Sequence, residues 1–250
     1  MKIMILGDVH GDFAAVNRLL VQKRPDLVLQ VGDFGFWPTE SGKKALYPYD
    51  PARHLKNHNS QGIPIPIYWC DGNHEELPEL LRRWRDAGGA LQPLEVSPAC
   101  YWMPRCSTLT LPGGRVVCFL GGAKSVDRAL GIEGKDWFPE EVLGPEVLDH
   151  LPARADIVIS HTAPRVFEIA KAETVAEGAG GRILPGLDLT PDPSEDILDE
   201  ALHRLQPSHW YFGHHHWERR GVTAGCRWHG LADLTRAGAG GRHWIWLPDC

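Results

Sequence analysis

Residues 211–217 read YFGHHHW, so three consecutive histidines stand between a glycine and a tryptophan. Neutral imidazole is the side chain that most often binds transition metals, which makes this stretch a candidate metal site. A His-rich turn exposed to solvent is the alternative. In an extended segment His214 and His216 share one side and His215 points away, because successive side chains alternate. We therefore expect two ligands and one bystander, provided that other parts of the chain supply further ligands.

Four other short motifs carry metal-type side chains. In chain order they are GDVHG with Asp8 and His10, GDF with Asp33, GNHE with Asn73, and SHTAP with His161. Each motif is ambiguous alone, since an aspartate in a turn is usually structural and a single histidine after a strand more often packs. Together with G-H-x-H they form an ordered set of carboxylates, an amide and imidazoles.

The elements that precede these motifs place them at one edge of a sheet. Apolar runs predict buried strands at 2–6, 26–31, 64–69, 156–160 and 209–212, and each run ends just before one of the motifs. In α/β sheets, ligands collect at the carboxyl ends of the strands. We therefore expect five strands to bring their metal-type side chains together.

The remaining elements follow from the spacing of apolar residues. Helices are expected at 13–20 behind an N-cap at Asp12, at 77–84, near 140–150, and at 194–205 behind an N-cap at Ser194. Residues 99–120 are rich in β-forming residues and predict a hairpin or meander, and 221–230 predicts a second hairpin. The loose stretch 171–193 predicts a surface excursion or lid. Because the chain has neither an internal repeat nor a linker, we expect one α/β domain over residues 1–250.

Composition excludes several classes of protein. The net charge of -6 argues against a general nucleic-acid surface, and no apolar run approaches the ~20 residues that cross a bilayer. The six cysteines lack CxxC spacing, which excludes a zinc ribbon and a thioredoxin motif. The apolar strand begins at once after Met1, so we expect no signal peptide before it. We expect a cytoplasmic protein with reduced thiols, no membrane contact and no obligate protein partner.

The order D-x-H, GD, GNHE, H, G-H-x-H resembles the calcineurin-like metallophosphoesterase superfamily over nearly the whole chain. The resemblance implies a four-layer α/β sandwich, with two mixed β-sheets flanked by helices and a metal site at the C-terminal edge of the strands. It implies one metal ion bound by Asp8, His10, Asp33 and His216, and a second bound by Asp33, Asn73, His161 and His214. Two cations ~3.5–4 Å apart repel each other, and the shared carboxylate of Asp33 would offset that repulsion. Mixed nitrogen and oxygen ligands suit Mn, Fe, Zn or Co better than Mg or Ca, and Mn²⁺ is our first choice.

The same resemblance implies a reaction. Hydroxide held between the two metals attacks phosphorus in line, and the cations offset the charge on the phosphoryl oxygens. His74 would protonate the leaving group as a general acid. Asp71 either orients His74 or only shapes the turn.

Other side chains are candidates for substrate contact. Arg128 and Arg105 are possible phosphate contacts, with a surface role as the alternative for each. Trp37 and Trp217 stand next to the metal motifs and either stack on a base, wall the cleft, or only pack.

One departure from the pattern of phosphoprotein phosphatases narrows the range of substrates to expect. Phosphoprotein phosphatases resemble one another in a GDxxDRG block and in an arginine before GNHE, whereas this chain has GDFGFWP and Asp71. Without those two arginines, the protein lacks the paired guanidinium hydrogen bonds that would bind a phosphomonoester dianion. We therefore expect a small phosphodiester or nucleotide-type substrate. The layout GDF, GNHE, GGxxS is also similar to the branch that includes lariat-debranching enzymes, over a shorter, catalytic-domain length. A phosphomonoesterase or protein phosphatase, a non-catalytic binding scaffold, and a structural or storage metal site are the alternatives.

Overall fold

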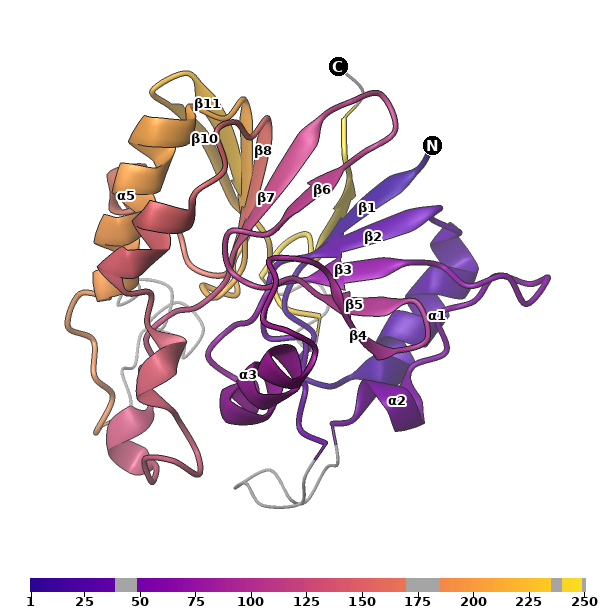
Figure 1. Cartoon of the computed structure of the whole chain (residues 1–250), viewed down its shortest axis with the longest axis horizontal. Helices are drawn as coiled ribbons and strands as arrows, with labels where there is room; N and C mark the ends of the chain where they lie inside the picture. Colours follow the sequence, from indigo (N-terminus) through magenta and orange to yellow (C-terminus); the bar gives the residue numbers. More distant parts are fainter. Residues whose placement is uncertain (39–48, 170–184, 235–239, 249–250) are drawn as a thin grey trace.

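The computed structural model describes residues 1–38, 49–169, 185–234 and 240–248. Within these ranges the strands form two six-stranded sheets (Figure 1). The first sheet consists, in spatial order, of β12 (Trp244–Trp246), β1 (Ile3–Leu6), β2 (Leu27–Gln30), β3 (Ile67–Trp69), β5 (Cys100–Trp102) and β4 (Leu94–Ser97). The second consists of β10 (Arg219–Thr223), β11 (Cys226–Gly230), β9 (His209–Phe212), β8 (Ile157–Ser160), β7 (Val116–Leu120) and β6 (Thr108–Thr110).

Both sheets have the same internal arrangement. Four parallel strands form the centre, and one antiparallel strand lies at each edge. Parallel strands covered on both faces are apolar throughout, as in the runs IMIL and IVIS. Because the central strands of a sheet all point the same way, the loops that follow them leave from one edge.

Alternate residues of the central strands belong to different apolar cores. Met4 packs outward into the cluster that includes α1, whereas Ile5 packs inward into a cluster shared with Ile159 of the second sheet. Trp210 packs outward from the second sheet against Leu198 of α5. Three apolar clusters therefore separate four layers of backbone, and the four-layer sandwich implied by the resemblance is confirmed.

Helices cover the outer faces of the two sheets, with α1 beside the first and α5 outside the second (Figure 1). The α-helices are α1 (Phe13–Lys23), α2 (Pro51–His54), α3 (Leu77–Asp86) and α5 (Pro193–Leu205). The 3-10 helices are η1 (Arg128–Leu130), η2 (Pro139–Glu141), η3 (Pro145–His150) and η4 (Arg165–Phe167).

The helix caps agree with expectation in one case and differ in another. Asp12 caps α1, since its Oδ1 accepts the N–H of Ala15 at 2.9 Å. The helix α5 begins one residue earlier than expected, at Pro193. Its cap is Asp192 rather than Ser194, because Oδ1 of Asp192 accepts the N–H of Ser194 at 2.8 Å.

The hairpin or meander expected at 99–120 is confirmed only in part. The strands β6 and β7 pair antiparallel on either side of LPGG in the second sheet, whereas β5 belongs to the first sheet. The region near 140–150 is not one α-helix but η2 and η3, because Gly144 and Pro145 interrupt it. The hairpin expected at 221–230 is confirmed as β10 and β11. Most of the expected lid, residues 171–184 of 171–193, lies outside the described residues.

The described cysteines, Cys70, Cys100, Cys106, Cys118 and Cys226, are buried and none of them forms a disulfide. Across the described ranges, no helix combines the length and the apolar character that a membrane span requires.

Candidate metal centre

Loops from both sheets meet at one edge of the sandwich. Asp8, Asp33 and Asn73 follow the carboxyl ends of β1, β2 and β3 in the first sheet. His161 and His214 follow the carboxyl ends of β8 and β9 in the second. Their side chains form two adjoining groups.

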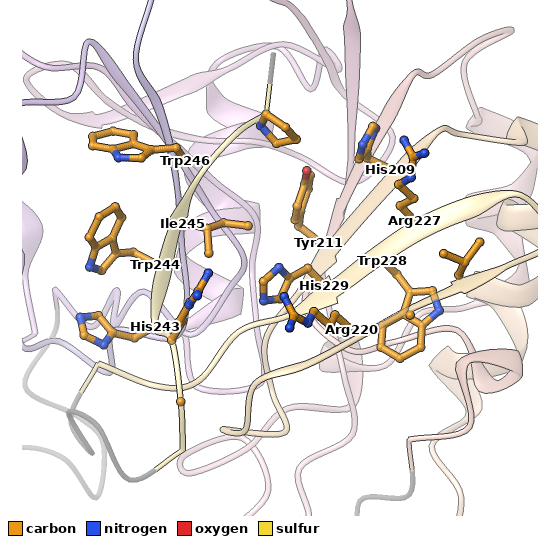
Figure 2. A pocket seen from close by; sticks show the side chains of 15 residues that line it. His209, Tyr211, Arg220, Arg227, Trp228, His229, His243, Trp244, Ile245 and Trp246 are labelled. Carbon is orange, nitrogen blue, oxygen red and sulfur yellow. The ribbon is translucent and has the colours of Figure 1, made fainter. Parts of the chain in front are cut away.

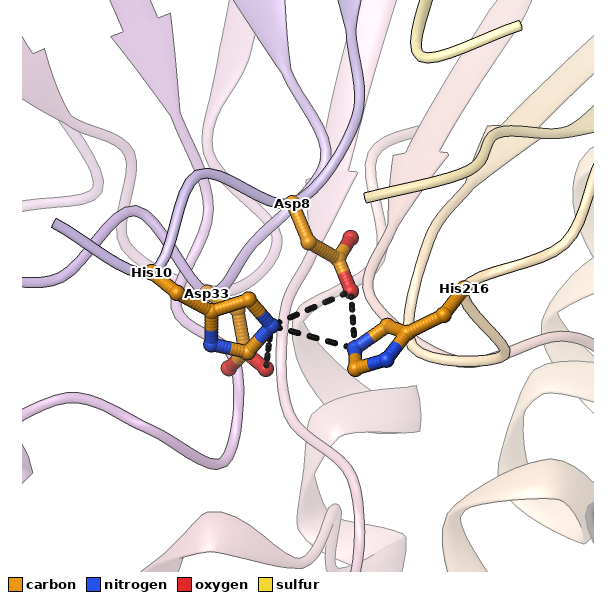
Figure 3. Close-up of side chains that lie close together, drawn as sticks. All are labelled: Asp8, His10, Asp33 and His216. Carbon is orange, nitrogen blue, oxygen red and sulfur yellow. Dashed lines mark hydrogen bonds and ion pairs between the residues drawn. The ribbon is translucent and has the colours of Figure 1, made fainter. Parts of the chain in front are cut away.

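The first group contains Asp8, His10, Asp33 and His216, and one donor atom of each lies within 4.8 Å of the others (Figure 3). Nε2 of His10 lies 3.0 Å from Nε2 of His216 and 3.7 Å from Oδ2 of Asp33. Nε2 of His216 lies 3.2 Å from Oδ2 of Asp8. Two imidazole nitrogens and two carboxylate oxygens in one place fit a transition metal better than Mg²⁺ or Ca²⁺.

The second group is built around His161. Its Nδ1 lies 3.0 Å from the carbonyl oxygen of Val31, which accepts a hydrogen bond, so this nitrogen carries the proton in the neutral ring. Its Nε2 then offers a lone pair, yet it faces Oδ1 of Asp33 at 3.3 Å and Oδ1 of Asn73 at 3.1 Å. The ring of His214 lies beside it, with the two centroids 4.9 Å apart. Three acceptor atoms that face one another require a cation or a proton between them.

The pKa values of this group reflect the same need for positive charge. Burial lowers the pKa of His161, but the nearby carboxylates, above all Asp33, raise it to about 9. Burial also raises the pKa of Asp33, yet the imidazoles of His161, His74 and His10 outweigh it and hold this pKa well below its usual range. Asp33 is therefore an ionised carboxylate that belongs to both groups.

Glycines allow the two groups to approach each other. A Cβ on Gly213 would lie 1.8 Å from Oδ1 of Asp8, and one on Gly72 would lie 2.1 Å from Oδ1 of Asp33. These contacts explain why a glycine precedes the ligand in GNHE and GHHH, because any larger residue would displace a carboxylate.

Several candidate ligands have left-handed backbones. The φ angles are +47° at His10, +51° at Asp33, +63° at His214 and +61° at His216. The expectation that residues 214–216 are extended is therefore wrong, and left-handed turns direct these histidines instead. Such a conformation costs a non-glycine residue about 1–2 kcal/mol, and such residues cluster at functional sites. His215 is buried, with its ring centroid 6.0 Å from that of Phe212.

Glu75 was not among the expected site residues. Its Oε1 accepts the N–H of Gly35 at 3.0 Å and its Oε2 accepts the N–H of Gly72 at 2.5 Å. Burial raises its pKa to about 8. Glu75 therefore joins the loop after β2 to the loop after β3, and the only signal for it is the last letter of GNHE.

Ser125 and Glu141 form a second unexpected contact, with Asn73. Nδ2 of Asn73 donates to Oγ of Ser125 at 3.2 Å, and Oγ of Ser125 donates to Oε2 of Glu141 at 2.7 Å. Because the serine hydrogen goes to Oε2 of Glu141, the serine oxygen is left to accept from Asn73. The amide oxygen of Asn73 is thereby turned toward His161.

His74 lies beside the first group. Its backbone N–H donates to Oδ1 of Asp33 at 2.8 Å, and its partly exposed ring has its centroid 5.3 Å from that of His10. The carboxylate of Asp71 instead accepts hydrogen bonds from Nε1 of Trp102 at 3.2 Å and from the guanidinium of Arg105 at 2.8 Å. Of its two expected roles, Asp71 has the structural one.

The other candidate contacts are engaged within the protein. Arg105 donates to Asp71 and to the carbonyl oxygens of Glu140, Glu141 and Val142. Arg128 forms an ion pair with Asp188 at 2.5 Å. Trp37 is 5% exposed and donates to the carbonyl of His74 at 2.7 Å, so it packs beneath the GNHE loop and offers no open face to a base. Trp217 is partly buried directly after His216.

Comparison with known proteins agrees with this geometry. A profile described as calcineurin-like phosphoesterase matches residues 1–218. A comparison with curated protein sequences finds no match. Among solved structures, TT1561 of Thermus thermophilus is 14% identical over 94% of this chain and 90% of its own, with a TM-score of 0.50, which indicates a shared fold. The phosphopantetheinyl hydrolase PptH of Mycobacterium tuberculosis is 12% identical over 99% of this chain and 96% of its own, with a TM-score of 0.49. From the match over residues 1–218, the chain belongs to the calcineurin-like phosphoesterase family.

Proposed function

We propose that this chain is a dinuclear metal-dependent phosphoesterase. The position of Asp33 carries the proposal, because Oδ2 faces His10 of the first group at 3.7 Å and Oδ1 faces His161 of the second at 3.3 Å. A carboxylate between two donor groups suits a pair of closely spaced cations, since it offsets their repulsion. A non-catalytic scaffold is the alternative, and the complete donor set favours the enzyme.

The donor chemistry fits two divalent transition-metal ions, with Mn²⁺ proposed first and Fe, Zn or Co as alternatives. Asp8, His10, Asp33 and His216 would hold one ion, and Asp33, Asn73, His161 and His214 the other. When bound, such ions polarise phosphoryl oxygens and lower the pKa of water.

His74 would hold the proton that the leaving group receives. Its backbone is fixed to Asp33, and its ring is partly exposed beside His10. A general acid must lie within hydrogen-bond reach of the leaving oxygen, and a ring at the mouth of the site meets that condition for a substrate bound between the two groups.

The proposed substrate is a small phosphodiester or nucleotide. The residue before Gly72 is Asp71, and its partner Arg105 is occupied by backbone carbonyls, so neither position supplies a guanidinium that could clamp a dianion at the metal centre. A diester bears a single negative charge and depends less on such a clamp. A cytoplasmic location stays a prediction, supported by five buried cysteines without a disulfide among the described residues.

Hydrolysis of bis-p-nitrophenyl phosphate and p-nitrophenyl phosphate with added Mn²⁺ tests the proposal. Asp33→Asn should lower kcat/KM by more than the ~10–100-fold that is typical when an outer-shell residue is lost. Asp26→Asn, at an exposed aspartate that accepts the backbone N–H of Lys2, is the matched control. Unchanged turnover in Asp33→Asn would refute the assignment, and faster turnover of the monoester would refute the proposed substrate class.

A further inference from the structure

A cleft lies between β12 of the first sheet and β9, β10 and β11 of the second (Figure 2). Its volume is about 930 Å³, within the ~300–1,000 Å³ range of small-molecule sites. We call it the arginine cleft, and define it by Arg220, Arg227, His209, Tyr211, His229 and Ile245.

The sheet register explains how this cleft arises. Arg227 pairs with His209 and His229 pairs with Tyr211 across β11 and β9, while Arg220 pairs with His229 across β10 and β11. Residues directly opposite on neighbouring strands lie on the same face of a sheet. Tyr211 belongs to the apolar core between the two sheets, so this face is the continuation of that inner face. Where the first sheet ends, at β12, the inner face of the second sheet changes from apolar to cationic.

The cleft is positively charged in a protein of net charge -6. Its lining contains no aspartate or glutamate among the residues that the structure describes. The carboxylate of Glu218 binds His229 at 3.0 Å and faces Nε of Arg242 at 3.9 Å. Among the described residues no carboxylate pairs with the exposed guanidinium of Arg220 or Arg227. Burial lowers the pKa of His209, and the charge of Arg227 lowers it further.

The walls of the cleft are flat or apolar. Tyr211 of β9 and Ile245 of β12 lie on opposite sides of the space between these strands, with His229 beside them (Figure 2). The rings of Trp244 and Trp246 project from the other side of β12 (Figure 2). A planar ring would therefore meet Tyr211, His229 and Ile245 rather than these tryptophans.

We propose that the arginine cleft binds a nucleoside phosphate, with the phosphate on Arg220 and Arg227 and the base between His229 and Ile245. Guanidinium groups match phosphate oxygens with two parallel hydrogen bonds, and these two arginines are diagonal neighbours on one face. An inorganic anion would leave the flat walls uncovered, and an uncharged ring would leave the two cations without a partner.

The arginine cleft is separate from the site proposed for hydrolysis. None of the described residues that line the cleft is a candidate metal ligand. His209, at its far end, stands at the start of β9, whereas His214 follows the end of that strand. The bound nucleoside phosphate is therefore a ligand of a second site and not the ester that the metal centre would cleave.

Calorimetric titration of the Mn²⁺-loaded chain with adenosine 5′-(β,γ-imido)triphosphate tests this binding. Arg220→Ala/Arg227→Ala should weaken it at least about tenfold, because two charge-assisted contacts are lost. Asp33→Asn, which alters only the metal centre, should leave binding in this cleft intact. Arg18→Ala/Arg85→Ala removes two exposed arginines elsewhere and is the matched control. The hydrolysis of bis-p-nitrophenyl phosphate by Arg220→Ala/Arg227→Ala should stay within about twofold of the parent.

Two further ligands separate the contribution of the phosphate charge to binding from that of the nucleoside ring. Inorganic tripolyphosphate and adenosine should each bind at least about tenfold more weakly than the complete nucleotide analogue. Equal binding of tripolyphosphate would overturn the proposal in favour of a general anion site. Equal binding of the nucleotide analogue to the parent and to Arg220→Ala/Arg227→Ala, or its loss in Asp33→Asn, would also overturn it. Should the double variant fail to fold, Arg227→Gln applies the same test with one substitution.

Discussion

Nε2 of His10 and Nε2 of His216 lie 3.0 Å apart, although 206 residues separate the two histidines in the chain. His10 follows β1 of the first sheet and His216 follows β9 of the second. A neutral pair at this distance shares one hydrogen, whereas metal coordination uses the lone pairs of both nitrogens. A cation held here would therefore join the two sheets as well as serve the reaction.

Mn²⁺ should for this reason stabilise the fold. At a free concentration 100 times the dissociation constant, it should raise the free energy of unfolding by about 2.7 kcal/mol if it binds only the folded chain. Urea unfolding of the chelator-treated and the Mn²⁺-loaded protein measures this increment. His216→Ala should lose it, and His203→Ala, at an exposed position on α5, should keep it. An equal increment in His216→Ala would show that Mn²⁺ binds elsewhere.

His74→Gln should slow hydrolysis most for poor leaving groups. A general acid contributes roughly 10²–10⁴-fold, and p-nitrophenolate leaves with little need of a proton. Values of kcat/KM for aryl phosphodiesters, from nitrophenol to phenol, should therefore fall more steeply with leaving-group pKa in the variant than in the parent. Metal content, measured in parallel, should be unchanged. A uniform loss along the series contradicts the acid role.

Ser125→Ala should weaken one metal ion selectively. Loss of an outer-shell partner typically costs ~10–100-fold in metal affinity, and Ser125 touches only Asn73 of the second group. Titration with Mn²⁺ should show one of two binding steps shifted. Ser107→Ala is the matched control, because Ser107 is equally buried and its Oγ has no hydrogen-bond partner among the described residues. A shift of both steps, or of neither, speaks against the positioning role.

The stability of the metal-free chain should fall with rising pH through Glu141. Burial raises the pKa of this carboxyl from 4.5 to about 8. Between these values the folded chain keeps a proton that the unfolded chain has released, so the free energy of unfolding decreases as pH rises, by up to ~1.4 kcal/mol per pH unit. Glu141→Gln removes the titratable carboxyl, so the free energy of unfolding measured in urea should depend less steeply on pH over the same window. Parallel curves for the two proteins would rule out the contribution.

Gly213→Ala should abolish metal binding through a steric clash, since Gly213 does not have a positive φ that would strain an alanine. The new Cβ would lie 1.8 Å from Oδ1 of Asp8, so the carboxylate has to move. Overpacking of this kind costs about 1–3 kcal/mol of stability. Gly113→Ala, at φ +99° with no atom within 4 Å of the new Cβ, carries a backbone cost alone and should bind Mn²⁺ like the parent. Mn²⁺ affinity retained in Gly213→Ala would mean that Asp8 is not a ligand.

The local pattern of apolar residues is sufficient to predict the central strands and the site residues that follow them. Runs such as IMIL and IVIS are buried on both faces, so their apolar character is visible without knowledge of their neighbours. Asp8 and His161 follow such runs directly. The order of the motifs along the chain indicates the family, and the family predicts the four-layer fold that the structure has.

Long-range pairing lies beyond such patterns. The strand β12 forms because Ile245 pairs with Ile5, and nothing within WIW itself indicates that partner. The switch between sheets after β5 depends equally on which strands are free to pair. Glu75 and Glu141 act through contacts with residues or loops that fold back on them, so only coordinates bring them into the site. The left-handed backbone of His214 and His216 is likewise fixed by surroundings, because a positive φ is uncommon for any residue other than glycine.

The strand β12 also determines when, during translation, the segment around the candidate ligand Asp8 can complete its backbone pairing. Ile5 of β1 pairs with Ile245, and the N–H of Gly7, directly before Asp8, donates to the carbonyl of His243 at 2.8 Å. Until the ribosome has delivered that segment, β1 keeps one side of its backbone unpaired, and such a side readily recruits strands of other chains. This edge of β1 therefore stays open to other chains until β12 has emerged and paired with it.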